Sequence, residues 1–110
     1  MSDAKFSGAL PKGDANGLGP IISALVAEPD RKHVIIGVVD NKQTITDNDT
    51  GDVVPVIRMR RIEVVPEIDR QVVEKVLRRA VESRMGVDVL PLELEDEITA
   101  LFADFDEAAD

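Results

Sequence analysis

The amino-acid sequence predicts an α+β fold. We expect a long antiparallel β-hairpin, alone or widened to a three-stranded sheet, with a short N-terminal helix, a main amphipathic helix and an acidic C-terminal helix. Two runs rich in β-branched residues, HVIIGVVD from residue 33 and VVPVIRMRRIEVV from residue 53, flank a cluster of turn-forming residues. After Pro66 the apolar period changes from two to about 3.6, and a second helical stripe closes the chain.

The N-terminal third predicts a short strand and a short helix. AKFSGAL, from residue 4, is compatible with a strand, whereas residues 11–19 are rich in Gly and Pro and predict a loose loop. In GPIISALVAEPD, Pro20 suits a first helical turn and Pro29 suits a helix end.

The middle of the chain predicts two long strands, residues 34–46 and 53–65, joined by a polar loop. Under strict alternation the second strand divides its apolar side chains between two faces. A one-residue bulge near Arg60–Arg61 would bring four of them to one face: Ile57, Met59, Ile62 and Val64.

Two amphipathic helices follow. The first ends before Gly86 and carries the stripe Ile68, Val72, Val73, Val76, Leu77, Ala80 and Val81. The second has an acidic first turn and the stripe Leu94, Ile98, Leu101, Phe102 and Phe105. Residues 106–110 are acidic and small, so we expect this tail to fray.

Length and composition limit the function. The chain has 110 residues, which predicts one domain over residues 1–110, and it has no cysteine, which excludes disulfides and thiolate metal sites. Its net charge is −9, and residues 87–110 hold nine acidic and no basic residues, which argues against nucleic-acid binding by the whole protein. The start of the chain lacks a secretory leader and no apolar run could cross a bilayer, so we expect a cytoplasmic protein without membrane contact.

The loop TDNDTGD, residues 46–52, contains two motifs of known sites. Asp49-Thr50-Gly51 matches the triplet of aspartic proteases, but the residues beside it are polar, whereas that aspartate must be buried and paired. An EF-hand counted from Asp47 would need a Glu where Arg58 stands. We therefore interpret the loop as a hairpin turn. Weaker calcium binding is an alternative that would use Asp47, Asn48, Asp49 and Asp52.

Other catalytic patterns have little support. His33, the only histidine, could act as a base beside Asp30 or Asp40, but we expect it to flank the first long strand. The glycines form no nucleotide-binding motif. A metal-dependent hydrolase is an alternative that would use Asp40, Asp52 and Glu63. We expect no enzyme activity, no cofactor and no bound metal.

Two surfaces are candidate binding sites. A basic face could bind an anion or could be a solvated, salt-bridged surface; its candidates are Arg58, Arg60, Arg61, Arg78 and Arg79. The C-terminal stripe could dock on a partner or pack on this chain; its candidates are Leu94, Ile98, Leu101, Phe102 and Phe105. In a further alternative, the acids of residues 93–110 imitate nucleic-acid phosphates and occupy a host DNA-binding protein.

The order of these elements suggests a family. The loop DNDTGDVV between two long strands, followed by RMRRIEVV, an amphipathic helix and an acidic tail, resembles the small early-region accessory proteins of actinobacteriophages over residues 34–106. The resemblance implies a phage accessory role in the host cytoplasm. Because a short sheet leaves strand edges open, we expect a homodimer or higher oligomer that acts by protein–protein interaction with itself or with a host or phage protein.

Overall fold

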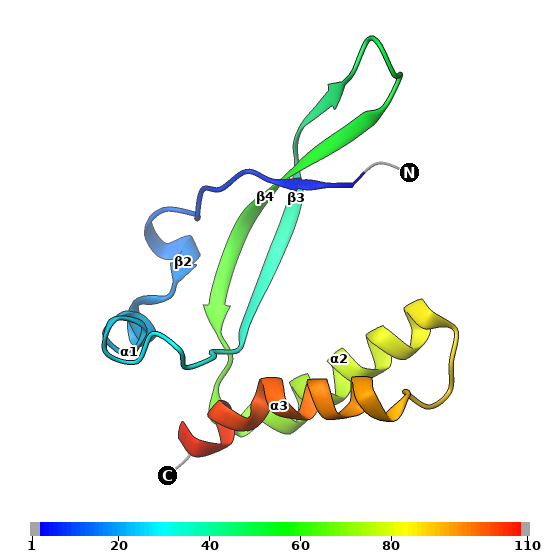
Figure 1. The fold of residues 1–110 in the computed structure, drawn as a ribbon. Helices are drawn as coiled ribbons and strands as arrows, with labels where there is room; N and C mark the ends of the chain where they lie inside the picture. Colours follow the sequence, from blue (N-terminus) through cyan, green and yellow to red (C-terminus); the bar gives the residue numbers. More distant parts are fainter. Residues whose placement is uncertain (1–2, 109–110) are drawn as a thin grey trace. The chain divides into compact units, whose positions relative to one another are not determined.

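The structure, a computed structural model, describes residues 3–108, with side chains described for residues 3–104. Its helices and its sheet, which contains the predicted hairpin, confirm the α+β class (Figure 1). The elements in chain order are β1 (Lys5–Phe6), η1 (Gly13–Ala15), β2 (Asn16–Gly17), η2 (Gly19–Ile21), α1 (Ile22–Ala27), β3 (Ile35–Thr46), β4 (Val53–Val64), η3 (Glu67–Asp69), α2 (Arg70–Met85) and α3 (Leu92–Ala108), where η marks a 3-10 helix.

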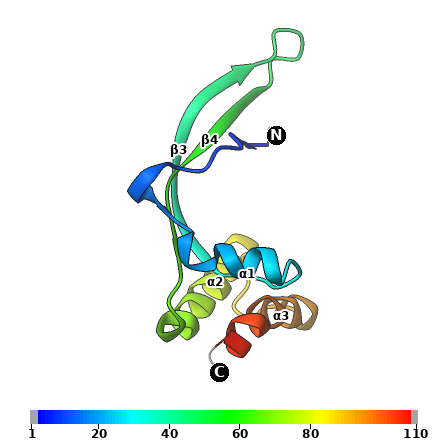
Figure 2. The same cartoon turned by 90° about the vertical axis from the view of Figure 1, so that its left-hand side faces the viewer.

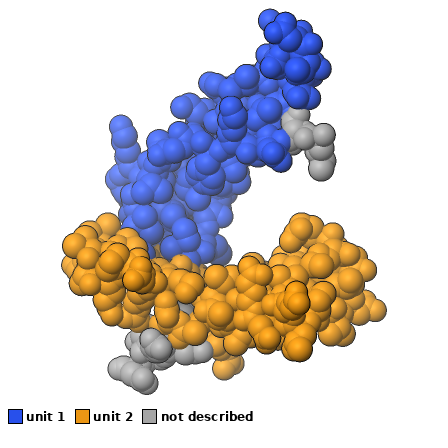
Figure 3. Space-filling view, viewed as in Figure 1, with its two compact units in different colours: residues 1–21, 35–63 blue, residues 22–34, 64–110 orange. Residues whose placement is uncertain are grey.

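The chain divides into two compact units, coloured separately in Figure 3. Unit 1 contains residues 1–21 and 35–63, and unit 2 contains residues 22–34 and 64–110. The sequence predicts a single domain and contains no signal for this division. Each unit combines two separate stretches of chain.

Unit 1 is built on β4, which lies between β3 and the N-terminal strands (Figures 1 and 2). β3 and β4 form the hairpin, and their bounds match the predicted strands to within one residue. β1 pairs with β4 in parallel, Lys5 with Val56. β2 also pairs with β4 in parallel, Asn16 with Ile62. The third strand that the sequence allowed is therefore present, and a fourth accompanies it.

The segment predicted as a loose loop, residues 11–19, is more regular than expected. It contains η1 and β2, and Gly17 of β2 pairs with Glu63 of β4. A Cβ on Gly17 would lie 2.8 Å from the carbonyl oxygen of Ile62, so only glycine lets the two backbones approach this closely. The glycine that suggested a loop is thus required for strand pairing.

The register of the hairpin shifts by one residue below its loop. The N–H of Asp47 donates to the carbonyl of Asp52 over 2.8 Å, which pairs these two residues directly. Strict alternation from that pair would place Asp40 and Arg58 on opposite faces of the sheet. Arg58 nevertheless donates two hydrogen bonds to Asp40, over 2.9 and 3.0 Å. A β-bulge between the loop and this ion pair accounts for the shift.

Further along the hairpin the register shifts back. A Cβ on Gly37 would lie 2.5 Å from the sulfur of Met59, so these two residues share a face. The N–H of Val65 donates to the carbonyl of Val34 over 3.1 Å. This pairing has the same register as the pair Asp47 and Asp52 beside the loop. The second shift therefore lies between Met59 and Val65, in the part of β4 that includes the bulge position predicted at Arg60–Arg61.

Unit 2 contains an antiparallel pair of helices, α2 and α3 (Figure 1). α2 ends at Met85 and is capped by Gly86, whose φ of 70° is left-handed and whose N–H donates to the carbonyls of Glu82 and Ser83. A core cluster of Leu90, Ile98 and Phe102 is packed by the partly buried Val34, Val73, Val81 and Leu94. The helix pair therefore encloses its own small core.

The end of α3 is held by the segment that precedes β3. The carboxylate of Asp104 accepts the backbone N–H of Lys32 over 2.7 Å, and its carbonyl accepts a hydrogen bond from Arg31 over 3.3 Å. The helix continues to Ala108, whereas the sequence predicts fraying from residue 106. Residues 109–110 and the side chains after residue 104 lie outside the described part.

Buried apolar side chains are few in this chain. Among the side chains that the structure describes, six apolar residues are buried: Val56, Ile62, Val65, Leu90, Ile98 and Phe102. Within residues 3–104, twenty large apolar residues are exposed, including Val72 and Val76 from the stripe of α2.

Candidate functional site

The outer edge of β3 is a long exposed surface on unit 1. Within residues 3–108, β3 pairs with β4 and with no other strand. All twelve residues of β3 are exposed. Its large apolar side chains are between 42% and 62% exposed: Ile35, Ile36, Val38, Val39 and Ile45. An edge with free backbone N–H and C=O groups and apolar side chains can accept a further strand.

The basic face predicted from the sequence is largely held by carboxylates of the chain itself. In unit 1, Arg58 binds Asp40 through two hydrogen bonds, and Nε of Arg60 lies 3.7 Å from the same carboxylate. The hydrogen bond from Arg58 lowers the pKa of Asp40, and the charges of Arg58 and Arg60 add to this effect against partial desolvation. The same contact raises the pKa of Arg58.

Arg61 has its own acidic partners. It donates to Glu63 over 2.7 Å and to the carboxylate of Asp14 over 3.2 Å. These hydrogen bonds, the one to Glu63 first, raise the pKa of Arg61. Arg61 therefore ties η1, on the N-terminal segment, to β4.

The remaining candidates of the basic face belong to unit 2. Arg78 donates to Glu74 over 3.3 Å and to the hydroxyl of Thr99 over 2.9 Å, and it forms an ion pair with Glu95. Arg79 is exposed on α2. Four of the five arginines thus form ion pairs within the chain, as the alternative of a solvated, salt-bridged surface would have it. The five arginines are divided between the two units, so they do not form one face within either unit.

The apolar stripe of the C-terminal helix packs on this chain. Ile98 and Phe102 are each 3% exposed, and Leu94 packs against them. Leu101, at 40% exposed, lies outside this core. The side chain of Phe105 lies outside the described residues. Of the two alternatives, packing on this chain therefore describes the buried Ile98 and Phe102 and the partly buried Leu94.

The carboxylates considered for metal catalysis have other roles. Asp40 binds Arg58 and Glu63 binds Arg61, while Asp52 stands at the end of the hairpin loop. Within the described part of the chain, no three histidine, aspartate or glutamate side chains converge as a metal site would require. Nε2 of His33 is buried, and no described residue forms a hydrogen bond with it, so no carboxylate orients that nitrogen.

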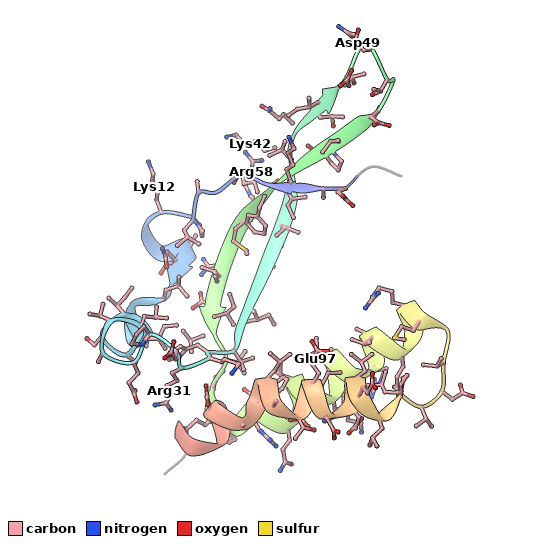
Figure 4. All side chains as sticks on the ribbon, in the orientation of Figure 1. Lys12, Arg31, Lys42, Asp49, Arg58 and Glu97 are labelled. Carbon is pink, nitrogen blue, oxygen red and sulfur yellow. The ribbon has the colours of Figure 1, made fainter. Side chains whose placement is uncertain are left out.

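The loop TDNDTGD forms the hairpin turn that the sequence predicts. The carboxylate of Asp47 accepts the backbone N–H groups of Asp49 (2.8 Å) and Thr50 (3.1 Å). Gly51 has a φ of 78°, a left-handed conformation that glycine adopts without strain. Figure 4 labels Asp49 at the tip of the hairpin. The side-chain oxygen of Asp47 thus stabilises the turn.

A hollow on unit 1 brings together residues that the sequence does not group. It has a volume of about 310 Å³, and its cationic lining residues are Lys12, Lys42, Arg58 and Arg60. Lys12 comes from the N-terminal segment, while the others come from the hairpin (Figure 4). Sequence reasoning selected arginines that are close together in the chain, so it missed both lysines. The glycines Gly8 and Gly13 were the signal in the sequence that this segment could turn back toward the hairpin, and both have a positive φ in the structure.

No protein-family model, no curated protein and no solved structure matches this chain. No helix within residues 3–108 is long and apolar enough to cross a membrane. The candidate sites therefore rest on the geometry of the chain alone.

Proposed function

We propose that this protein is a non-enzymatic binding protein of the cytoplasm that acts by self-association, with a second copy pairing on the edge of β3. The exposed edge of β3 carries the proposal: twelve residues long, it pairs on one side only within the described chain. The resemblance to early-region proteins of actinobacteriophages is the reason to place this role among phage accessory proteins.

The sequence of the edge suits a second copy of itself. The five residues from Ile35 to Val39 read Ile-Ile-Gly-Val-Val, so two β-branched residues stand on each side of Gly37. Two such strands, antiparallel about a two-fold axis at Gly37, would place Ile35 opposite Val39 and Ile36 opposite Val38. β-branched side chains would then face each other across the pair, a favourable combination.

The distribution of exposed apolar residues along β3 supports the same segment. Four of the five exposed apolar residues of β3 lie on either side of Gly37: Ile35, Ile36, Val38 and Val39. Pairing between two copies would shield these side chains.

The test compares two lysine substitutions on one strand. In Ile36→Lys the two introduced charges would lie near the two-fold axis, so we expect the oligomer to dissociate to a monomer. In Ile45→Lys, the matched control, the charge would lie outside the paired segment, and the oligomer should persist. Light scattering over a range of concentrations gives the mass, and circular dichroism verifies that both variants fold.

Two results would contradict the proposal. A wild-type monomer at every concentration would exclude self-association. An oligomer that Ile45→Lys dissociates as readily as Ile36→Lys would exclude pairing about Gly37. Ile68→Lys, on η3, provides a second control, because Ile68 is 89% exposed and lies in unit 2.

A further inference from the structure

The cationic hollow of unit 1 is formed by two parts of the chain. The N-terminal segment turns after β1, where the N–H of Ser7 donates to the carbonyl of Ile57 over 2.9 Å. Gly8 and Gly13, with φ values of 82° and 64°, allow the turns of the segment that contributes Lys12. The hairpin contributes Lys42, Arg58 and Arg60.

The charge in this hollow has the opposite sign to that of the whole chain. Four basic side chains line it, and the carboxylate bound to them is that of Asp40. Arg58 uses Nε and one terminal nitrogen for Asp40, which leaves its other terminal nitrogen for a ligand. Among the described residues, neither Lys12 nor Lys42 forms an ion pair. A chain with a net charge of −9 thus has a local excess of positive charge.

We propose that this hollow binds a small organic phosphate, a phosphomonoester with a compact body. Guanidinium groups and lysine ammonium groups are the protein groups that bind phosphate oxygens most strongly. The volume of about 310 Å³ is at the lower end of the range for small-molecule sites. Leu10, Pro11 and Met59 provide apolar lining for the body of the ligand.

A small ligand fits the hollow better than a nucleic acid does. The overall negative charge of the chain repels a polyanion, whereas a small anion experiences mainly the local field. No aromatic side chain lines the hollow, so stacking of bases has no platform there. A single-stranded oligonucleotide therefore serves as a comparison ligand in the test.

The test measures the binding of ribose 5-phosphate to the full chain by isothermal titration calorimetry. We expect ribose 5-phosphate to bind, ribose to give no signal, and inorganic phosphate to bind more weakly because it lacks the body. In Lys42→Gln the dissociation constant should rise about tenfold, the factor that corresponds to the loss of one hydrogen bond to a charged group. Lys75→Gln, with the same charge change on α2 of unit 2, should leave binding unchanged.

A second variant should change affinity in the other direction. Asp40→Asn removes the carboxylate that competes for Arg58 and Arg60, so ribose 5-phosphate should bind more tightly. Equal weakening by Lys42→Gln and Lys75→Gln would overturn the proposal. Unchanged or weaker binding in Asp40→Asn would also overturn it, as would binding of ribose alone. Failure of ribose 5-phosphate to bind, or stronger binding of the oligonucleotide, would also overturn it.

Discussion

The two compact units place their apolar residues differently. Unit 2 covers Ile98 and Phe102 with its own helix pair, whereas unit 1 exposes the whole of β3. A helix can bury one stripe against a neighbouring helix in the same chain. A two-stranded hairpin has two faces and two edges, and the short N-terminal strands cover only part of the edge of β4. Unit 2 thus has a core cluster formed with its helix pair, whereas every residue of β3 in unit 1 is exposed.

The ion pairs of the two units differ in the same way. Arg78 and Glu74 in unit 2 have side chains that are 19% and 18% exposed. Arg58 and Asp40 in unit 1 are 41% and 44% exposed. Exposed pairs contribute little to folding stability because solvent screens them. Arg58 is thus more accessible to an external anion than Arg78.

The largest expected effect tests the core of unit 2. Phe102→Ala should lower the free energy of unfolding by about 3–5 kcal/mol, because it leaves a cavity beside Leu90 and Ile98. Leu101→Ala, the neighbouring residue at 40% exposed, should cost less than about 1.5 kcal/mol. Urea denaturation followed by circular dichroism measures both. Similar losses in the two variants would mean that this stripe is not the core.

A smaller effect is expected where the backbone of unit 1 is tightest. Gly17→Ala places a Cβ against the carbonyl of Ile62, so we expect a loss of about 1–3 kcal/mol and faster amide exchange in β2. Gly19→Ala is the matched control, since a Cβ there meets no atom within 4 Å. Hydrogen exchange by mass spectrometry compares the variants. Unchanged exchange in β2 of Gly17→Ala would contradict the pairing of β2 with β4.

The smallest effect is a shift in protonation. Asp40 has a lowered pKa in the folded protein, so its contribution to stability is present above about pH 4 and is lost as the pH falls through the lowered value. In Arg58→Gln the pKa of Asp40 should rise, and the stability difference from the wild type should shrink in acid. Carbon-13 NMR of the Asp40 carboxyl group measures the titration. An unchanged pKa would show that Arg58 does not hold this carboxylate in solution.

Local patterns explain which elements could be predicted. β-branched runs on either side of a turn-forming cluster located β3 and β4, and a stripe ending before Gly86 located α2. Periodicity reveals an apolar face but not what covers it, so Val72 and Val76 were expected in the core and are exposed. The hollow could not be predicted, because Lys12 and Lys42 are far apart in the sequence and come together through parallel pairing of two-residue strands.

That parallel pairing also determines the order in which unit 1 can fold. Lys5 and Asn16 leave the ribosome long before Val56 and Ile62, the residues with which they pair. The contacts of the hairpin are local in sequence, so it can form without the N-terminal strands. The N-terminal strands can pair only after β4 has formed, and their pairing closes a long loop at a cost in conformational entropy. We therefore expect the segment that carries Lys12 to dock last, and an anion that bridges it to Lys42 would then stabilise the final step of folding.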